Sequence, residues 1–261
     1  MSEVNEQPHL GERAQVPSQS LLGGPLKQIA HELRTPLTTL RLALQVGLGR
    51  LQRGRSIEPS TFEKALAQVD HLAALITKLS DAAIIASGEI PLELEALDIA
   101  EVLQQATDRF AQEGARHSVQ FDRTLVSAYA FADRRRLERV VASLLDNACK
   151  FSPPETQIRV SLESDDCEVH FSIADNGIGV PVLEQDRVFE LFYRASNASQ
   201  SCTQGLGLGL FTAREIIAKH GGRIWLESEL TKGSTLHVAL PSSLSSEPVT
   251  RATESRTSRL A

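Results

Sequence analysis

The feature that most limits how this chain can fold is a leucine-rich stripe near its start, where apolar residues recur at steps of three and four. Its members are Leu26, Ile29, Leu33, Leu37, Leu40, Leu44, Leu48 and Leu51. Since a helix turns once every 3.6 residues, this spacing places them along one narrow face, as in a coiled coil. The pattern predicts one long amphipathic helix whose seam needs a partner.

A second stripe of the same kind follows a break at Gly54, Ser56 and Pro59. It consists of Phe62, Leu66, Val69, Leu72, Ile76, Leu79 and Ala83. Two helices joined by a short link form an antiparallel hairpin. A lone hairpin buries both stripes poorly, so we expect two copies of the chain to associate as a homodimer with a four-helix bundle.

The periodicity changes near residue 90, where short alternating runs appear between helical ones. Expected strands cover residues 92–96, 119–125, 158–163, 168–174, 223–229 and 235–240, and expected helices cover 99–113, 134–151 and 208–220. Strands mixed with helices, closing in a hairpin around Lys232 and Gly233, predict an α+β sandwich.

The predicted organisation therefore has two domains between two irregular ends. A flexible leader covers residues 1–20, the helical hairpin 21–88, the α+β domain 92–241 and a disordered tail 242–261. The link between the domains, around residues 87–92, is expected to act as a hinge.

Composition narrows the classes of function. The formal net charge of −6 argues against a nucleic-acid binder, because phosphate contacts need a basic surface. Three cysteines without metal-ligand spacing are typical of a reduced protein with incidental thiols. The first twenty residues lack the basic start and apolar run of a signal peptide, and the most apolar window, residues 72–86, is shorter than the ~20 residues of a membrane span. We expect a cytoplasmic chain that inserts in no membrane.

One histidine in the first predicted helix has an unusual setting. At 100° per residue, His31 lies about 160° from Leu33, so it is expected on the exposed face. Pro36 follows within the predicted helix, where a proline removes a backbone hydrogen bond and destabilises the helix by about 3 kcal/mol. Glu32 is able to accept the ring N–H of His31, which leaves the other ring nitrogen free to act as a nucleophile. An exposed histidine alone is usually of no consequence.

Residues 31–37, with the sequence HELRTPL, resemble the H-box of histidine kinases, and the hairpin resembles their dimerisation and phosphotransfer domain. The resemblance implies that His31 accepts the phosphoryl group and that Glu32 is its acid–base partner. It also implies that Thr35 orients water when the partner protein is dephosphorylated.

Four further segments carry chemistry in the second domain. On the helix 134–151, Ser143, Asn147 and Lys150 fall within a sector of about 60°, where an amide oxygen suits a hard cation and an ammonium suits a phosphate. Residues 175–179 (DNGIG) follow a strand, and residues 205–210 (GLGLGL) open a helix whose first N–H groups favour an anion. Residues 188–194 (VFELFYR) precede a small polar run typical of a mobile lid. Each signal is weak by itself.

In this order and spacing the segments resemble the N, G1, F and G2 boxes of the histidine-kinase ATP-binding domain, a class shared with type II topoisomerases, Hsp90 chaperones and MutL repair proteins. The resemblance implies ATP and Mg²⁺ as ligands, with Asn147 holding the metal and Lys150 and Arg194 near the phosphates. It further implies a nucleotide-binding role for Asp175, Gly177, Gly179, Gly205, Gly207 and Gly209, with Asp175 reading adenine and the last three as lid hinges.

One position departs from the family. Ser143, four residues before Asn147, stands where these kinases usually carry a second asparagine and where the related ATPases carry a glutamate that activates water. Serine is a poor base, so hydrolysis of ATP in the site is disfavoured. Because Ser143 replaces that asparagine, the predicted magnesium site also lacks a second amide ligand.

The sequence thus predicts a protein-histidine kinase that phosphorylates His31 from Mg-ATP and passes the group to an aspartate on the receiver domain of a response regulator. A sensory input from a partner or an upstream segment is implied. Three alternatives stay open. They are an ATPase of the wider class, a degenerate kinase that acts as a phosphatase or scaffold, and a dimerisation hairpin with a silent nucleotide fold.

Overall fold

The computed structural model describes residues 23–88, 91–112, 117–122, 128–200 and 205–243. The chain separates into two compact units, residues 1–68 and 69–261, with the boundary inside the second helix. No helix within the described ranges is both long and apolar enough to cross a lipid bilayer. The predicted leader and the part of the predicted tail after residue 243 lie outside the described residues.

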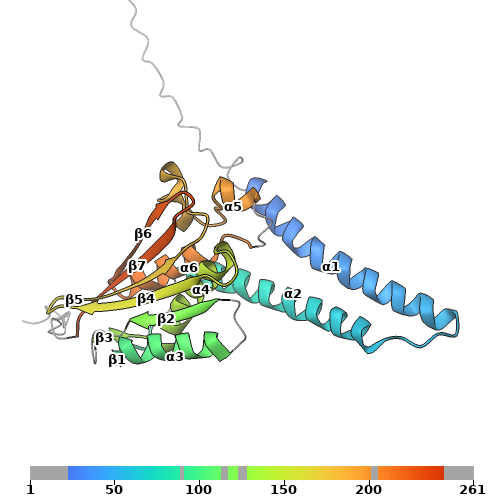
Figure 1. Ribbon diagram of the computed structural model, residues 1–261, viewed down its shortest axis with the longest axis horizontal. Helices are drawn as coiled ribbons and strands as arrows, with labels where there is room; N and C mark the ends of the chain where they lie inside the picture. Colours follow the sequence, from blue (N-terminus) through green and yellow to red (C-terminus); the bar gives the residue numbers. More distant parts are fainter. Residues whose placement is uncertain (1–22, 89–90, 113–116, 123–127, 201–204, 244–261) are drawn as a thin grey trace, which may run out of the picture. The chain divides into compact units, whose positions relative to one another are not determined.

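The first unit contains α1 and the start of α2, the two helices that the leucine stripes predict (Figure 1). The first, α1 (Gly23–Gln52), continues through Pro36 as one helix, and α2 (Pro59–Ala86) follows after a short loop. The helix–loop–helix connection is closed by an ion pair between Arg50 and Glu58 at 2.6 Å.

The loop end of the hairpin is closely packed around Gly47. Gly47 on α1 is buried, and a Cβ added there would touch the side chains of Ile57 and Thr61 at 3.7 Å. Much of the predicted seam nevertheless stays exposed, with Leu44 at 52% and Leu48 at 56%. The hairpin alone therefore does not bury its own stripes.

The second unit is an α+β sandwich, which confirms the predicted fold class. Its elements after α2 are β1 (Glu95–Asp98), α3 (Ile99–Gln112), β2 (Ser118–Asp122), β3 (Tyr129–Ala132), α4 (Arg134–Phe151), β4 (Gln157–Ser164), β5 (Glu168–Asp175), the 3₁₀ turns η1 (Val182–Glu184) and η2 (Arg187–Phe189), α5 (Ser196–Gln200), α6 (Gly209–Lys219), β6 (Arg223–Glu229) and β7 (Gly233–Pro241).

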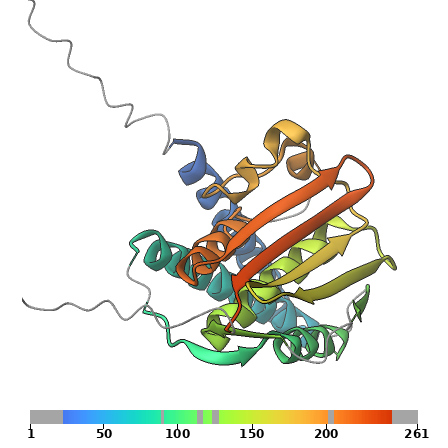
Figure 2. The same ribbon diagram turned by 90° about the vertical axis from the view of Figure 1, so that its left-hand side faces the viewer.

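Five strands form the main sheet in the order β2-β4-β5-β7-β6, and β1 pairs separately with β3. Only β2 and β4 run parallel; the other neighbours in this sheet are antiparallel. The helices α3, α4 and α6 cover one face of the sheet (Figure 2). Alternate residues such as Phe171 and Ile173 on β5 point into that side and are fully buried, as period-two patterning requires.

The end of α2 belongs to this unit. Ile85 is 2% exposed and joins the hydrophobic core of the sandwich, and the Asp81 carboxylate pairs with Arg139 on α4. The carboxyl end of β7 is also tied in, because Ser242 is buried and bridges to Ala130 on β3.

Sequence patterning missed two elements. No strand was predicted over β3, because its inward positions, Ala130 and Ala132, are small and give a weak alternating signal. The polar run after Arg194, which is typical of a mobile lid, contains the short helix α5, and no helix is predicted there from the sequence. The first strand was predicted at residues 92–96, whereas β1 covers Glu95–Asp98.

Candidate nucleotide site and candidate phospho-acceptor

The candidate acceptor, His31, lies on α1 and is exposed, as its helical position predicts. The hydroxyl of Thr35, one turn later, donates a hydrogen bond to the His31 carbonyl oxygen at 3.1 Å. Glu32 is half-buried beside it. Pro36 lies within the same helix and, lacking an N–H, donates no helical hydrogen bond of its own.

The helix α4 carries the first group of nucleotide candidates. Its apolar face is buried in the core, and Asp133 caps its first turn by accepting the Arg136 N–H at 3.0 Å. Asn147 is half-buried, and within the described residues its amide makes no hydrogen bond. Lys150 is exposed at the last turn and pairs with Asp146. The Asn147 amide is therefore available to a ligand, whereas Lys150 would have to exchange Asp146 for a phosphate.

Asp175 ends β5 and is held by two backbone groups. Its Oδ1 accepts the N–H of Gly177 at 2.7 Å and that of Ser234 at 3.3 Å. Burial raises the pKa of Asp175, and the two N–H donors oppose this only in part. Within the part of the chain that the structure describes, no hydrogen bond reaches Oδ2. The site thus presents a desolvated acceptor oxygen, which suits the exocyclic amine of adenine.

The two glycines of the loop after β5 are required by close contacts. A Cβ at Gly177 would lie 2.6 Å from the carbonyl oxygen of Phe151, at the end of α4. Gly179 has a φ of +68°, and a Cβ there would lie 2.2 Å from the carbonyl oxygen of Glu229. The loop therefore packs its backbone between α4 and the β6–β7 turn.

The glycine-rich stretch before α6 packs in the same way. A Cβ at Gly207, with a φ of +67°, would lie 2.5 Å from the Tyr193 carbonyl oxygen, and one at Gly209 would lie 2.7 Å from Ser143 Oγ and 3.8 Å from Asn147 Nδ2. Gly205 has open space around it. Two of the three glycines thus bring the start of α6 against the candidate lid segment and against α4.

Arg194 lies at the end of the segment before α5 and donates to the Ala198 carbonyl oxygen at 3.2 Å. Phe192, two residues earlier, has a φ of +64°, which is unfavourable for a bulky residue. Arg187 stacks on the Tyr193 ring at 4.3 Å. This segment is therefore a folded turn held by its own side chains.

Three residues that the sequence did not single out hold this region together. The Asn197 amide donates to the Gly179 carbonyl oxygen at 2.8 Å. Glu184 accepts both the N–H and the hydroxyl of Ser196, at 2.8 and 2.7 Å. Ser228 on β6 accepts the Val180 N–H at 2.8 Å. Nothing in one sequence marks such long-range pairs.

The donor set fits a magnesium ion carried by a nucleotide. Among the described residues no cluster of three or more His, Cys, Asp or Glu side chains is able to hold a metal ion. Mg²⁺ commonly takes one or two protein ligands and completes its shell with phosphate oxygens and water. The Asn147 amide beside Gly209 is consistent with that arrangement.

Two protein families match the chain. The family described as "His Kinase A (phospho-acceptor) domain" matches residues 26–88. The family described as "Histidine kinase-, DNA gyrase B-, and HSP90-like ATPase" matches residues 132–244. The first range contains His31, and the second contains every nucleotide candidate named above.

Individual relatives agree. The chain is 30% identical to sensor histidine kinase WalK of Bacillus subtilis over 217 residues, covering 82% of this chain and 35% of WalK. It is 33% identical to the histidine-protein kinase/phosphatase MprB of a Mycobacterium species over 221 residues, covering 81% of this chain and 42% of MprB. The chain therefore spans less than half the length of these curated relatives.

Solved structures share the fold. Histidine kinase AdeS of Acinetobacter baumannii superposes with a TM-score of 0.64 at 26% identity, over 81% of this chain and 97% of AdeS. Full-length ShkA in complex with AMPPNP superposes with a TM-score of 0.59 at 26% identity, over 83% of this chain and 46% of ShkA.

Proposed function

Since this chain belongs to the sensor histidine kinases of two-component systems, we propose that it transfers the γ-phosphoryl group of Mg-ATP to His31 and then to an aspartate of a response regulator. The hairpin, residues 21–88, acts as the dimerisation and phosphotransfer domain, and residues 92–241 act as the ATP-binding domain. An AMPPNP complex of the similar kinase ShkA supports the choice of nucleotide.

The observation that carries this proposal is the convergence of separate motifs on one helix. The loop of Gly177 packs on the end of α4, and Gly209 packs on Ser143 of the same helix. Asn147 lies between these contacts along α4. Motifs that are separate in the sequence thus meet on α4, which supports a site with a base acceptor, a metal ligand and an anion-binding helix start.

The proposed roles follow from the chemistry of each side chain. Asp175 reads the adenine amine, Lys150 and Arg194 lie near the phosphates, and Asn147 holds the magnesium ion. Gly205, Gly207 and Gly209 let the adjoining segment close over the ligand. When bound, Mg²⁺ neutralises phosphate charge.

In the transfer itself a ring nitrogen of His31 attacks the γ-phosphorus, and the bond from that phosphorus to the bridging oxygen of ADP breaks. Glu32 takes the proton from the other ring nitrogen, so the product is a neutral phosphohistidine ring with ADP as the leaving group. Such catalysis consists mainly of positioning and charge stabilisation.

Ser143 favours this proposal over an ATPase of the wider class. The Ser143 hydroxyl, on α4, lies against Gly209 at the start of α6. In an ATPase a base at this position would have to activate water, and a serine hydroxyl is not a base near neutral pH. The γ-phosphoryl group is therefore retained for His31.

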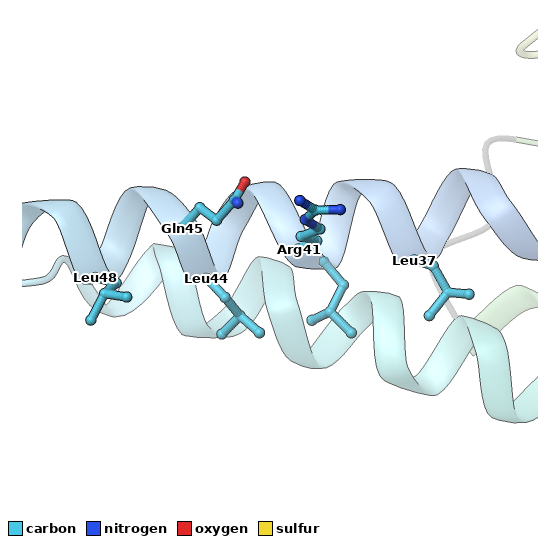
Figure 3. A pocket seen from close by; sticks show the side chains of 6 residues that line it. Leu37, Arg41, Leu44, Gln45 and Leu48 are labelled. Carbon is cyan, nitrogen blue, oxygen red and sulfur yellow. The ribbon is translucent and has the colours of Figure 1, made fainter.

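Dimerisation is proposed from the exposed seam of α1. An apolar groove runs along this helix and is lined by Leu37, Leu40, Arg41, Leu44, Gln45 and Leu48. Figure 3 shows Leu37, Leu44 and Leu48 extending from one side of the helix. A second hairpin completes a four-helix bundle over these leucines. Replacing Leu44 and Leu48 with glutamate should convert a dimer to a monomer in analytical ultracentrifugation.

Phosphatase activity toward the regulator is proposed for Thr35, which is exposed one turn from His31. The relative MprB is named as both kinase and phosphatase. A Thr35→Ala variant should still become labelled on His31 but should dephosphorylate a phosphorylated receiver domain more slowly than the parent. Equal rates for the two proteins would assign Thr35 no part in dephosphorylation.

The central test is incubation of the whole chain with γ-labelled ATP. The intact chain should gain acid-labile, alkali-stable label, as expected of phosphohistidine, and His31→Gln should gain none. His71→Gln, which alters a histidine on α2, is the matched control and should label normally. Label that persists in His31→Gln, or that is absent from the intact chain, would overturn the proposal.

A further inference from the structure

Three strand ends meet beside the candidate adenine acceptor. Asp175 ends β5, Ser234 lies at the start of β7, and Ser228 lies near the end of β6. On the central strand β7, Ser234 lies opposite Asp175 of β5 on one side and opposite Ser228 of β6 on the other. By strand alternation all three side chains belong to the helix-covered face, because they continue the series of Ile173, Leu236 and Leu226.

The hydroxyl of Ser228 uses its whole hydrogen-bonding capacity. It accepts the Val180 N–H at 2.8 Å and donates to the Gly233 carbonyl oxygen at 2.8 Å. Its third contact is the Ser234 hydroxyl at 2.9 Å. A serine hydroxyl has one hydrogen and two lone pairs, so Ser234 must be the donor in that contact. One oxygen atom thereby fixes a loop, a turn and a neighbouring strand.

The main chain of Ser228 adds a fourth tie. Its carbonyl oxygen accepts the Gln185 side chain at 2.8 Å, and the same amide donates to the Val180 carbonyl oxygen at 3.1 Å. Gln185 directly follows η1. The loop after Gly179 is therefore tied to β6 at Val180, directly through the Val180 N–H and indirectly, through Gln185, by the Val180 carbonyl oxygen.

These ties determine where the acceptor carboxylate points. Ser234, held by Ser228, donates its N–H to Asp175 Oδ1 at 3.3 Å. Gly233 packs so closely that a Cβ there would lie 1.9 Å from the Asp175 carbonyl oxygen. The turn has no room to shift toward Asp175, and the hydroxyl of Ser228 prevents it from moving away.

We propose that Ser228 is a positioning residue for nucleotide recognition, which holds Asp175 and the Gly177–Val180 loop in the geometry that accepts adenine. The inference rests on the proposed kinase function, because Asp175 is the base acceptor there. Loss of the hydroxyl leaves the Val180 N–H and the Ser234 hydroxyl half-buried without a partner. The loop and turn then relax, and the Asp175 carboxylate loses its orientation.

Two readouts distinguish positioning from a general loss of structure. Adenine offers an exocyclic amine to Asp175, whereas guanine offers a carbonyl oxygen at that place, so a disoriented carboxylate discriminates less between them. Ser228 does not face the transferred phosphoryl group in this proposal, so the chemical step should be unaffected once ATP is bound. The expected signature is a higher KM for ATP at unchanged kcat, together with a smaller preference for ATP over GTP.

The experiment compares four whole-chain proteins: the parent, Ser228→Ala, Ser228→Thr and Ser172→Ala. Ser172 makes a matched hydroxyl pair with Ser161 across β4 and β5 at 2.7 Å, on the opposite face of the sheet. Calorimetry gives the Kd for ATP and for GTP, and initial rates of His31 labelling give KM and kcat. Thermal melts monitor folding.

Ser228→Ala should raise Kd and KM for ATP about tenfold, the equivalent of about 1.4 kcal/mol, and lower the ATP-to-GTP preference. Ser228→Thr keeps a hydroxyl and should stay close to the parent, as should Ser172→Ala. Unchanged ATP binding in Ser228→Ala, a fall in kcat alone, or a threonine variant as impaired as the alanine variant would each overturn the inference.

Failure of the proposed function gives a different result. In that case the parent binds ATP without labelling His31, and the calorimetric comparison of the four proteins still decides the role of Ser228. A parent chain that binds no ATP would overturn both.

Discussion

Gly209 at the start of α6 lies directly against Ser143 on α4, so that a Cβ on the glycine would come within 2.7 Å of the serine Oγ. The glycine is helical with an ordinary φ, and only this contact opposes a side chain. The same Cβ would lie 3.8 Å from Asn147 Nδ2, so this contact also limits how closely the start of α6 approaches the Asn147 amide.

A Gly209→Ala variant should therefore bind ATP more weakly, and a second change at Ser143 should restore binding. The serine must leave its rotamer, at a cost of about 1 kcal/mol, or roughly fivefold in Kd. In Gly209→Ala/Ser143→Ala the obstructing oxygen is gone. Titration with ATP compares the variants with Ser143→Ala alone. A double variant as weak as Gly209→Ala would show that the Ser143 contact is not the cause.

Gly233→Ala should be far more damaging and should have no such rescue. Its φ is +107°, and the Cβ would lie 1.9 Å from the backbone oxygen of Asp175, which no rotamer change relieves. Backbone strain of this kind costs of order 1–3 kcal/mol before the clash is counted. Urea unfolding should show the loss, and ATP binding should disappear. Gly205→Ala, in open space, is the control and should remain stable.

Replacing Asp175 with asparagine should separate stability from binding. Burial raises the pKa of Asp175, which means that the folded state favours the protonated carboxyl over the ionised one. The contribution of this group to the free energy of unfolding is therefore present at low pH and is lost as pH rises through the raised pKa. Asp175→Asn should accordingly be at least as stable as the parent near neutral pH, yet bind ATP at least tenfold more weakly.

Thermal melts and ATP titrations check both halves of this prediction. In the parent, ATP affinity should also fall as acidification protonates Asp175, above the pH at which an ordinary aspartate titrates. A variant that is clearly less stable than the parent at neutral pH would contradict the desolvation argument.

Asp133 should show the opposite pH behaviour. Burial alone raises its pKa, but the N–H groups of Arg136 and Glu93, together with the nearby charges of Arg136 and His220, lower the pKa overall. The carboxylate thus contributes stability above its unfolded pKa of 3.8, which is lost as pH falls through the lower folded value.

An Asp133→Ala variant loses this cap and should be destabilised by about 2 kcal/mol near neutral pH. The gap to the parent should narrow at strongly acidic pH, as measured by urea unfolding. Asp165→Ala, which removes an exposed carboxylate that also accepts two backbone N–H groups, should cost less. A difference in unfolding free energy that does not change with pH would show that the charge of Asp133 does not contribute to the cap.

The cysteines should differ in reactivity. Burial, helped by the Asp146 charge, raises the pKa of Cys149 to about 11, so only about one thiol in a thousand is ionised at pH 8. Cys167 is exposed. Treatment of the folded chain with iodoacetamide should modify Cys167 before Cys149, and Cys149 should react readily only after unfolding in urea, as followed by mass spectrometry. Similar rates in the folded chain would contradict the predicted burial.

Local periodicity was enough to predict most elements. The stripes from Leu26 to Leu51 and from Phe62 to Ala83 predict α1 and α2, and the pattern over residues 223–229 matches β6. These signals are strong because large apolar side chains repeat at the period of the element. The strand β3 was missed because alanine fills its inward positions.

The sequence by itself determined the two-part architecture, the exposure of His31 and the residue types able to meet a nucleotide, since each depends on neighbours within a few turns or on a contiguous motif. Only the tertiary structure decided how these residues are supported. The contacts of Asn197 with Gly179, of Ser228 with Val180 and of Gly209 with Ser143 join segments far apart in the chain. Such contacts depend on strand register and helix packing, which local periodicity does not encode.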